Sequence, residues 1–297
     1  MQAASASHHI SSGSCLNRCS VIVRATPHVP PNVPRGATIV SEWPFSQAVI
    51  VAHRGDSAHL AENTLEAFAS AIELGAEAVE FDVRMTSDGV AVVIHDADVS
   101  RTTDGSGLVR SMTLDQLRRL RIELGGGGAA GVPTLEEALD VLSGRAAADI
   151  EIKNVPSEPD FDPDREEAVE ATIAALASTG FVGPVIISSF NPLAIARSRE
   201  LAPHLPTGLL TDRSVEADAG LAFARAQDHA WVLPAVEALL GAPDGFAERV
   251  HVAGMRVGTW ISDDPDEAVG LMHSGVDAVA TNDPGRILAA RRRAFGA

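Results

Sequence analysis

The chain has 297 residues, a length that suits either two domains of ~150 residues or a single α/β barrel of ~250 residues. Hydrophobic residues make up 45% of it, and the 4% of aromatic residues include no tyrosine, so we expect a sizeable core built mainly from aliphatic side chains. Lys and Arg number 23 against 40 Asp and Glu, and the resulting net charge of −17 excludes a generic nucleic-acid binder and argues against docking on anionic lipid by charge alone.

The first 44 residues show no pattern of a folded element. They are rich in Ser, His and Pro, and their longest aliphatic stretch, at 21–23, is shorter than the ~7–15 apolar residues of a signal peptide. Cys15 and Cys19 follow two adjacent histidines, which is not the usual order of a zinc site, so we interpret them as two thiols in a loose tail. We expect residues 1–44 to be a disordered extension, residues 45–297 to form one domain, and the protein to be cytoplasmic, since no apolar run approaches the ~18 residues of a membrane span.

From residue 47 onward, short aliphatic runs alternate with amphipathic segments. The runs are typical of buried parallel strands and lie at 48–52, 78–83, 91–95, 148–152, 185–188, 208–211, 231–235, 257–261 and 278–281. Helical patterns lie between most of them, at 64–74, 134–142, 165–178, 192–201, 216–227, 244–253, 266–274 and 284–292. This alternation predicts a TIM-type (β/α)₈ barrel rather than an open doubly wound sheet, and no Gly-x-Gly-x-x-Gly motif follows the first strand.

One connection is too short for a crossover helix. Only residues 84–90 separate the second and third predicted strands, and the Asp-Gly pair at 88–89 is a turn signal. The chain here forms either a hairpin or an irregular crossover, so we expect the barrel to be distorted around strands 2 and 3. A hairpin centred between residues 87 and 88 would set Glu80 opposite His95, and so an imidazole beside a pair of carboxylates.

Acidic residues interrupt two of the predicted strands. Glu80 and Asp82 share one face of the second strand, where two unpaired carboxylates would raise each other's pKa and a hard divalent cation would remove the repulsion. Glu151 ends a later strand, and Lys153 shares its face. The pattern therefore indicates three metal ligands and a cation for a phosphate; the alternatives are exposed acids on an edge strand and a buried ion pair that supports the barrel.

Two histidines end predicted strands. His53 and Arg54 follow the first strand at its C-terminal end, where the catalytic groups of a barrel gather, and His95 closes the third strand beside Asp96. Histidine transfers protons near neutral pH, and the planar guanidinium of arginine can donate paired hydrogen bonds to a phosphate. Cleavage of a phosphodiester needs one proton removed from the attacking hydroxyl and one delivered to the leaving alkoxide, tasks that two histidines can share, although a lone histidine is more often structural.

An ordered set of motifs runs from about residue 49 to residue 288. The motifs are His53-Arg54-Gly55, Glu62-Asn63-Thr64, Glu80-x-Asp82, Asp88-Gly89, Val92-Val93-Ile94-His95-Asp96, Arg101-Thr102-Thr103, Gly105-x-Gly107, Pro133-Thr134-Leu135-Glu136-Glu137, Glu151-x-Lys153, Ser188-Ser189-Phe190, Trp260 and Thr281-Asn282-Asp283-Pro284. Each motif alone is weak, but in this order they resemble the glycerophosphodiester phosphodiesterase family. The resemblance implies a TIM-type barrel that hydrolyses glycerophosphodiesters to glycerol 3-phosphate and an alcohol.

The resemblance also implies roles for nine residues and for one divalent cation, Ca²⁺, Mg²⁺ or Mn²⁺. The residues are Glu80, Asp82 and Glu151 as metal ligands, His53 and His95 as the acid/base pair, Arg54 and Lys153 as phosphate-binding cations, and Phe190 and Trp260 as the lining of the substrate cleft. The alternative for the two aromatic residues is a place in the barrel core.

The family is related in design to phosphoinositide-cleaving phospholipases C, which suggests a mechanism. A glycerol hydroxyl next to the phosphate attacks phosphorus, one histidine takes its proton, the other protonates the leaving alcohol, and water then opens the cyclic phosphate. Direct attack by water is the simpler alternative. Two further hypotheses are a lysophospholipase D-type phosphodiesterase and a phosphodiester-binding barrel without turnover. We expect a small-molecule glycerophosphodiester as the partner, and no nucleic acid.

Two features depart from the pattern of the family. Asp263 stands where relatives often carry asparagine, so it adds negative charge near the expected site and could alter substrate preference. The segment 105–131 is short and glycine-rich where relatives often hold a larger insertion, which predicts an open cleft.

Overall fold

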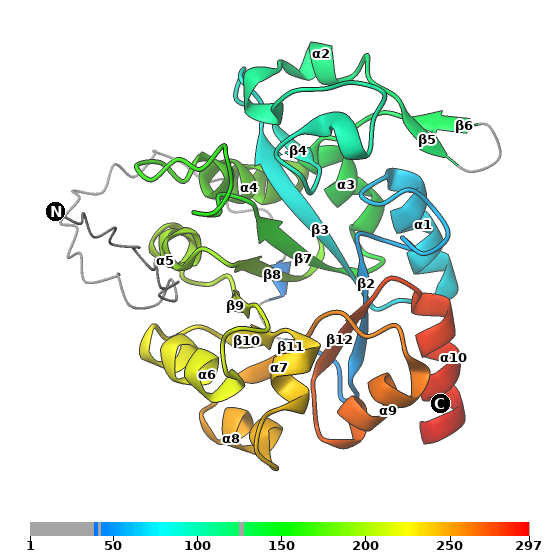
Figure 1. Ribbon diagram of the computed structural model, residues 1–297, viewed down its shortest axis with the longest axis vertical. Coiled ribbons are helices and arrows are strands. Elements are labelled where there is room, and N and C mark those ends of the chain that lie inside the picture. Colours follow the sequence, from blue (N-terminus) through cyan, green and yellow to red (C-terminus); the bar gives the residue numbers. More distant parts are fainter. Residues whose placement is uncertain (1–38, 41–42, 125–127, 297) are drawn as a thin grey trace, which may run out of the picture. The chain divides into compact units, whose positions relative to one another are not determined.

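A computed structural model describes residues 39–40, 43–124 and 128–296, and its central feature is a closed ring of eight parallel strands. The strands are β2 (Val49–His53), β3 (Ala78–Met85), β7 (Ala147–Ile152), β8 (Gly183–Ser189), β9 (Thr207–Thr211), β10 (Trp231–Pro234), β11 (Arg256–Thr259) and β12 (Ala278–Thr281). Around the ring the order is β8-β7-β3-β2-β12-β11-β10-β9, and β9 pairs back to β8 (Figure 1). The predicted TIM-type barrel is confirmed.

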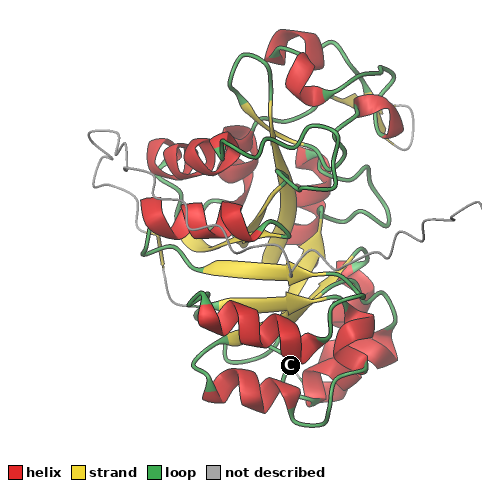
Figure 2. Cartoon of the chain, turned by 60° about the vertical axis from the view of Figure 1, so that its left-hand side comes forward, coloured by secondary structure: helices red, strands yellow, loops and turns green. Residues whose placement is uncertain are grey.

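Helices connect the strands and lie outside the ring (Figure 2). They are α1 (Leu65–Leu74), α3 (Leu135–Leu142), α4 (Glu167–Thr179), α5 (Pro192–Leu201), α6 (Ala217–Ala226), α7 (Val236–Leu240), α8 (Phe246–Val252), α9 (Pro265–His273) and α10 (Pro284–Phe295). Side chains cap several of these helices: Thr64 caps α1, and Thr134 forms a reciprocal capping box with Glu137 at α3. All eight predicted helices are present, and the short α7 is an addition.

The predicted hairpin is present, but in a different register. The strand β4 (Ala91–Val93) lies off the ring and pairs antiparallel with the end of β3, so the barrel is distorted where we expected. Val83 pairs with Val93, one residue away from the expected register, so His95 does not stand opposite Glu80. The physical reason is the turn: Thr86 and Val90 close a three-residue loop in which Gly89 adopts φ 79°, whereas the expected register assumes a two-residue loop.

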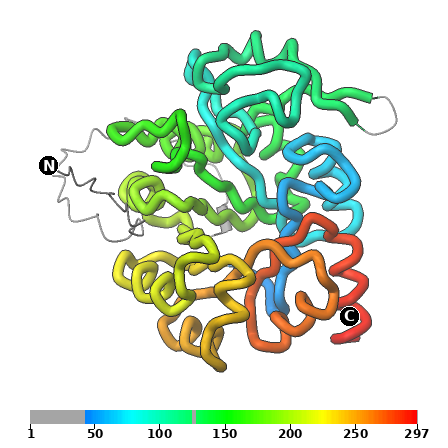
Figure 3. Tube along the Cα trace, viewed as in Figure 1, coloured from blue at the N-terminus to red at the C-terminus, as the bar shows by residue number. Residues whose placement is uncertain are grey.

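The connection after β4 is a small subdomain rather than a plain glycine-rich loop (Figure 3). It contains the 3₁₀ turns η2 (Val99–Arg101) and η3 (Val109–Ser111), the helix α2 (Leu114–Leu117), and the hairpin of β5 (Ile122–Leu124) and β6 (Gly128–Ala130). It has a hydrophobic core of its own, formed by Val92, Ile94, Val99, Val109, Leu117, Ile122 and Val132. Part of the glycine run, residues 125–127, lies outside the described residues.

Two pieces of the expected N-terminal extension join the barrel. The strand β1 (Ile39–Val40) pairs parallel with the start of β8, and the Trp43 ring packs edge-on against Trp231, with ring centroids 4.9 Å apart. Cys15 and Cys19 lie outside the described residues. Among the helices that the structure describes, none is long and apolar enough to cross a membrane.

Strand alternation decides what the barrel encloses. Residues of one parity point into the ring, and apolar ones fill its interior: Val49, Val51, Ala78, Ala147, Ile186, Trp231, Leu233, Ala278 and Ala280. Residues of the other parity, such as Phe81 and Ile150, pack beneath the helices. On β3 and β7, the inward-facing positions towards the C-terminal ends are occupied by charged residues.

Candidate active site

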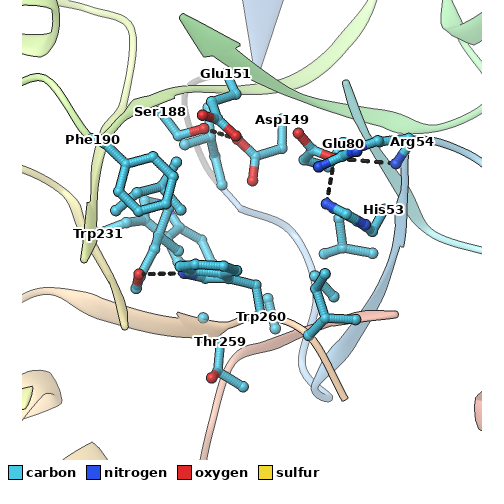
Figure 4. Close-up of a pocket in the computed structure, with 18 of the residues that line it drawn as sticks. His53, Arg54, Glu80, Asp149, Glu151, Ser188, Phe190, Trp231, Thr259 and Trp260 are labelled. Atoms are coloured by element: carbon cyan, nitrogen blue, oxygen red, sulfur yellow. Dashed lines mark hydrogen bonds and ion pairs between the residues drawn. The ribbon is translucent and has the colours of Figure 1, made fainter. Parts of the chain in front are cut away.

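Residues from distant parts of the chain meet in one pocket at the C-terminal ends of the barrel strands (Figure 4). Eight of the nine predicted site residues line it: His53, Arg54, Glu80, His95, Glu151, Lys153, Phe190 and Trp260. The ninth, Asp82, is fully buried directly behind this lining. The structure therefore brings together all the side chains that the sequence assigns to the site.

Three buried carboxylates form a compact acidic cluster. Glu80, Asp82 and Glu151 each contribute an oxygen atom, these oxygens all lie within 4.8 Å of one another, and the residues are at most 7% exposed. Asp82 and Glu151 are partners in the β3–β7 register, which places their side chains in one layer of the barrel. Glu80 Oε1 is buried and accepts no hydrogen bond from the described residues. An oxygen-only donor set with such an atom fits a hard divalent cation.

The three carboxyl groups do not respond alike to their surroundings. Burial, together with the charges of Asp82 and Glu151, raises the pKa of Glu80 well above its usual value, and burial raises the pKa of Glu151 to about 7. Asp82 is also buried, but Lys153 and Arg54 hold its pKa below the usual value. The expectation that unpaired carboxylates would raise each other's pKa is met at Glu80, whereas Asp82 is not unpaired because it faces two cations.

Lys153 and Arg54 provide the positive charge of the site. Lys153 Nζ lies 2.6 Å from Glu151 Oε1 and 3.2 Å from Asp82 Oδ1. Burial lowers the pKa of Lys153, but the charges of these two carboxylates outweigh burial and hold it above its usual value. Arg54 Nε lies 3.3 Å from Asp82 Oδ2. The Arg54 backbone adopts φ 57°, and its N–H donates to the Glu80 carbonyl at 2.8 Å. The chain leaves β2 through a left-handed turn that aims the guanidinium into the pocket.

His53 is largely buried, with 12% of its side chain exposed, and is held by a neutral partner. Its Nδ1 lies 2.8 Å from Asn282 Oδ1, and its Nε2 lies 3.8 Å from Glu80 Oε2. Burial, assisted by the charge of Arg54, lowers the pKa of His53 to about 4. The imidazole is therefore neutral at physiological pH, with Nε2 on the side of the acidic cluster (Figure 4).

His95 is held by a charged partner. Its Nδ1 lies 2.6 Å from Asp96 Oδ1, and Asp96 in turn pairs with Arg101. Arg101 binds both oxygens of Glu62, at 2.7 and 2.8 Å, and Glu62 Oε1 lies 2.9 Å from Arg54 Nη1. Burial still lowers the pKa of His95. Glu62 and Arg101 belong to motifs to which no role could be assigned from the sequence. In the structure they connect Arg54 to Asp96, the partner of His95.

Arg84, which was not predicted from the sequence, holds the backbone at two of the site residues. It is 2% exposed, and its guanidinium donates to the backbone carbonyl of His95 at 2.7 Å and to that of Lys153 at 3.1 Å. Its other partners are the carboxylates of Glu158 and Asp160. Arg84 shares the inward parity of Glu80 and Asp82 on β3, and this parity is the signal from which it could have been found.

Two further polar side chains, Asp149 and Ser188, line the pocket, and Asn63 lies behind the lining; none of the three was predicted as a site residue. Asn63 donates to Asp82 Oδ2 at 2.7 Å. Asp149 lies one inward position below Glu151 and accepts a hydrogen bond from Ser188 Oγ at 2.6 Å; burial raises the pKa of Asp149 to about 6. It is therefore a second inward-facing acid on β7 that stands outside the acidic cluster.

Opposite the charged groups, the pocket wall is aromatic. Phe190 and Trp260 pack edge-on with ring centroids 5.3 Å apart, and Trp260 Nε1 donates to the Leu233 carbonyl at 3.0 Å. Both rings line the pocket and neither is fully buried, so they are not simply core residues. Lys153 Nζ lies 5.9 Å from the centre of the Phe190 ring, within the range of a cation–π contact.

Known proteins are similar to this chain in sequence and in fold. A profile of the glycerophosphoryl diester phosphodiesterase family matches residues 53–286. A glycerophosphodiester phosphodiesterase from Caldanaerobacter subterraneus is 32% identical over 80% of this chain and 95% of its own length. Two solved structures are also similar. One is an Oleispira antarctica phosphodiesterase in complex with the product sn-glycerol-3-phosphate, with a TM-score of 0.70 and 27% identity over 82% of this chain and 96% of that one. The other is a glycerophosphodiester phosphodiesterase from Agrobacterium tumefaciens, with a TM-score of 0.67 and 27% identity over 82% of this chain and 99% of that one. The chain therefore belongs to the glycerophosphoryl diester phosphodiesterase family and is an enzyme of that family.

Proposed function

We propose that this enzyme hydrolyses glycerophosphodiesters to sn-glycerol 3-phosphate and an alcohol in a reaction that depends on a divalent cation. The observation that carries the proposal is the convergence of three buried carboxylates and two imidazoles on one pocket. Membership of the family and the product bound to the Oleispira antarctica relative support the substrate class. A phosphodiester-binding barrel without turnover would not need all five of these groups.

Glu80, Asp82 and Glu151 would hold the cation. When bound, the cation would lower the pKa of an attacking hydroxyl and offset charge on the phosphoryl oxygens. Arg54 and Lys153 would bind the phosphate, since both project into the pocket beside the acidic cluster. Their positive charge is needed because the chain as a whole is strongly acidic.

The two histidines would divide the proton transfers according to their partners. His53, whose Nδ1 meets a neutral amide, would accept the proton of the glycerol hydroxyl next to the phosphate at Nε2. That oxygen forms a bond to phosphorus as the bond to the leaving oxygen breaks. His95, whose imidazolium Asp96 would stabilise, would give a proton to the leaving alkoxide. Water then opens the cyclic phosphate with the roles reversed; direct attack of water on the diester would use the same two groups.

The aromatic wall favours one second candidate. Phe190 and Trp260 give the pocket an apolar side, against which the acyl-bearing part of a lysophospholipid could lie. The same chemistry would then release lysophosphatidic acid or a cyclic product. The two candidates share the cation and the histidines and differ in the group attached to glycerol.

The test is an assay of the purified full-length chain with glycerophosphocholine and lysophosphatidylcholine, each with Ca²⁺, Mg²⁺ or Mn²⁺ and each with a chelator. We expect release of sn-glycerol 3-phosphate from glycerophosphocholine with at least one cation, and none with the chelator. Turnover of lysophosphatidylcholine alone would support the second candidate. No turnover of either substrate with any of the three cations would contradict the proposal.

A further inference from the structure

Asp263 does not line the pocket, although its charge was expected to influence substrate preference. Its carboxylate accepts three hydrogen bonds from the end of β12 instead. Oδ1 accepts from Thr281 Oγ1 at 2.8 Å and from the Asn282 backbone N–H at 2.7 Å, and Oδ2 accepts from Asn282 Nδ2 at 2.7 Å. Asn282 is the same residue that holds His53.

This contact decides which way the Asn282 amide points. A carboxylate can only accept hydrogen bonds, so the NH₂ group of Asn282 has to face Asp263. The Asn282 oxygen is then left on the opposite side, 2.8 Å from His53 Nδ1. An amide oxygen accepts but does not donate, so His53 Nδ1 has to carry the proton in this hydrogen bond.

We propose that Asp263 is a positioning residue that fixes the tautomer of His53 through the side-chain amide of Asn282. With the proton on Nδ1, the lone pair of the neutral ring is on Nε2, which is the nitrogen that faces Glu80 and the pocket. A proton acceptor at the reacting centre needs that lone pair. The consequence for catalysis rests on the proposed role of His53, whereas the tautomer itself does not.

The substitution that tests the chain of contacts is Asp263→Asn, which keeps the shape and replaces one acceptor oxygen by a donor. If the new NH₂ group faces Asn282 Nδ2, two donors meet, and the Asn282 amide rotates to present its own NH₂ group to His53 Nδ1. His53 then carries its proton on Nε2. The opposite orientation of the new amide would set its NH₂ group against the Asn282 backbone N–H, which is also unfavourable.

Two further variants make the test specific. Asp264→Asn is the matched control: it removes the same charge one residue away, where Asp264 caps α9 by accepting from two backbone N–H groups, a task that asparagine performs equally well. The double variant Asp263→Asn with Asn282→Asp is the rescue. It places a carboxylate against His53 Nδ1, which again requires the proton there, and an amide at 263 that can donate to it.

The tautomer of His53 is read by long-range ¹H–¹⁵N NMR at pH 8 on full-length protein labelled in histidine, with the His53 signal assigned by its loss in His53→Gln. The same variants are assayed for kcat and KM with glycerophosphocholine. We expect Nδ1–H in the wild type, in Asp264→Asn and in the double variant, and mainly Nε2–H in Asp263→Asn. We expect kcat of Asp263→Asn to fall roughly 10- to 100-fold with KM little changed, because Asp263 is exposed and water leaves part of the population in the original tautomer.

The possible results separate the inference from the proposed function. Nε2–H in the wild type, or an unchanged tautomer in Asp263→Asn, would overturn the inference. A switched tautomer with unchanged kcat would uphold the role of Asp263 in orienting the ring and contradict the role of His53 as proton acceptor. A loss of kcat that the double variant does not recover, with Nδ1–H restored, would likewise count against that role of His53.

Discussion

Two walls of the barrel follow the same structural rule and carry opposite chemistry. On β3 and β7 the inward pairs are Glu80 with Asp149 and Asp82 with Glu151. On β11 and β12 an inward pair is Gly258 with Ala278, which lies nearer the N-terminal ends of the strands because Ala278 pairs with Val49 at the start of β2. Each wall is a parallel strand pair with outward residues packed under helices. They differ in that one wall encloses buried charge and the other encloses small apolar groups.

The difference indicates what each wall contributes. Buried carboxylates oppose folding unless cations compensate them, and the pKa values of Glu80, Asp149 and Glu151 are all raised by burial. We therefore infer that the charged wall serves the reaction rather than the stability of the fold. The apolar wall has no such cost, and it shapes the space in which the substrate would lie. Substitutions in the acidic cluster of the charged wall should therefore change cation binding and rate, and those in the apolar wall should change stability.

The largest effect is expected for Glu80→Gln. This change removes one charge from the acidic cluster and keeps the size of the side chain, so we expect cation affinity to fall and the rate to drop by about 10³-fold or more. Asp149→Asn is the matched control, because Asp149 is the register partner of Glu80 but lies outside the cluster. Calorimetric titration with Mn²⁺ and the phosphodiesterase assay check both. Equal loss of Mn²⁺ affinity in the two variants would contradict the assignment of Glu80 as a ligand.

Arg84→Met should be the most destabilising change in the charged wall. It leaves the carboxylates of Glu158 and Asp160 and the carbonyls of His95 and Lys153 without their buried partner, at a cost of about 3 kcal/mol in the free energy of unfolding. Arg118→Met, which removes an exposed pair with Glu137, should cost less than about 1 kcal/mol. Urea denaturation measures both, and similar losses would show that Arg84 does not support the wall.

The histidines should affect rate without affecting the fold. His53→Ala and His95→Ala should each lower kcat by at least ~10²-fold, because each removes a proton transfer. His273→Ala, at an exposed position of α9, is the control and should leave kcat unchanged. Circular dichroism checks that the variants are folded. If the two site variants unfold instead, the histidines are structural residues of the barrel.

Gly258→Ala probes the apolar wall. The added Cβ would lie 2.8 Å from Leu233 Cδ2, and Leu233 has little room to move because it also packs against Gly208 on the other side. We expect a loss of roughly 1–3 kcal/mol in the free energy of unfolding with unchanged Mn²⁺ affinity. Gly270→Ala, in α9 with open space around it, should instead stabilise by about 0.5–1 kcal/mol. A weakened cation site in Gly258→Ala would show that the two walls are not independent.

The smallest effect is expected for Glu166→Gln, at a half-buried acid outside both walls. Burial raises the pKa of Glu166 from its usual 4.5 to about 7. The folded state therefore binds the proton more tightly than the unfolded state, so this group's contribution to stability decreases as pH rises from 4.5 to 7. The neutral variant lacks that decrease, so its Tm should exceed that of the wild type at pH 8 and approach it at pH 5. An equal Tm difference at the two pH values would contradict this sign.

Much of the fold could be predicted because strand periodicity is local. Aliphatic runs located all nine predicted strands, and alternation within β3 and β7 placed Glu80 on one face with Asp82 and Glu151 on one face with Lys153. The register of the β3–β4 hairpin was wrong by one residue because it depends on whether two or three residues form the turn, and the left-handed conformation of Gly89 selects three. A shift of one residue moves a side chain to the other face.

What the sequence determined on its own is which charged and aromatic groups meet at the pocket, since alternation and strand ends are properties of neighbouring residues. What the tertiary structure decided is how these groups are held. Arg84 reaches carbonyls from two separate strand ends, and Asn282 meets His53 across 229 positions of the chain. Arg84 makes its contacts because β3 lies between β4 and β7, and Asn282 reaches His53 because barrel closure brings β2 beside β12. No local pattern in the sequence records which strands become neighbours.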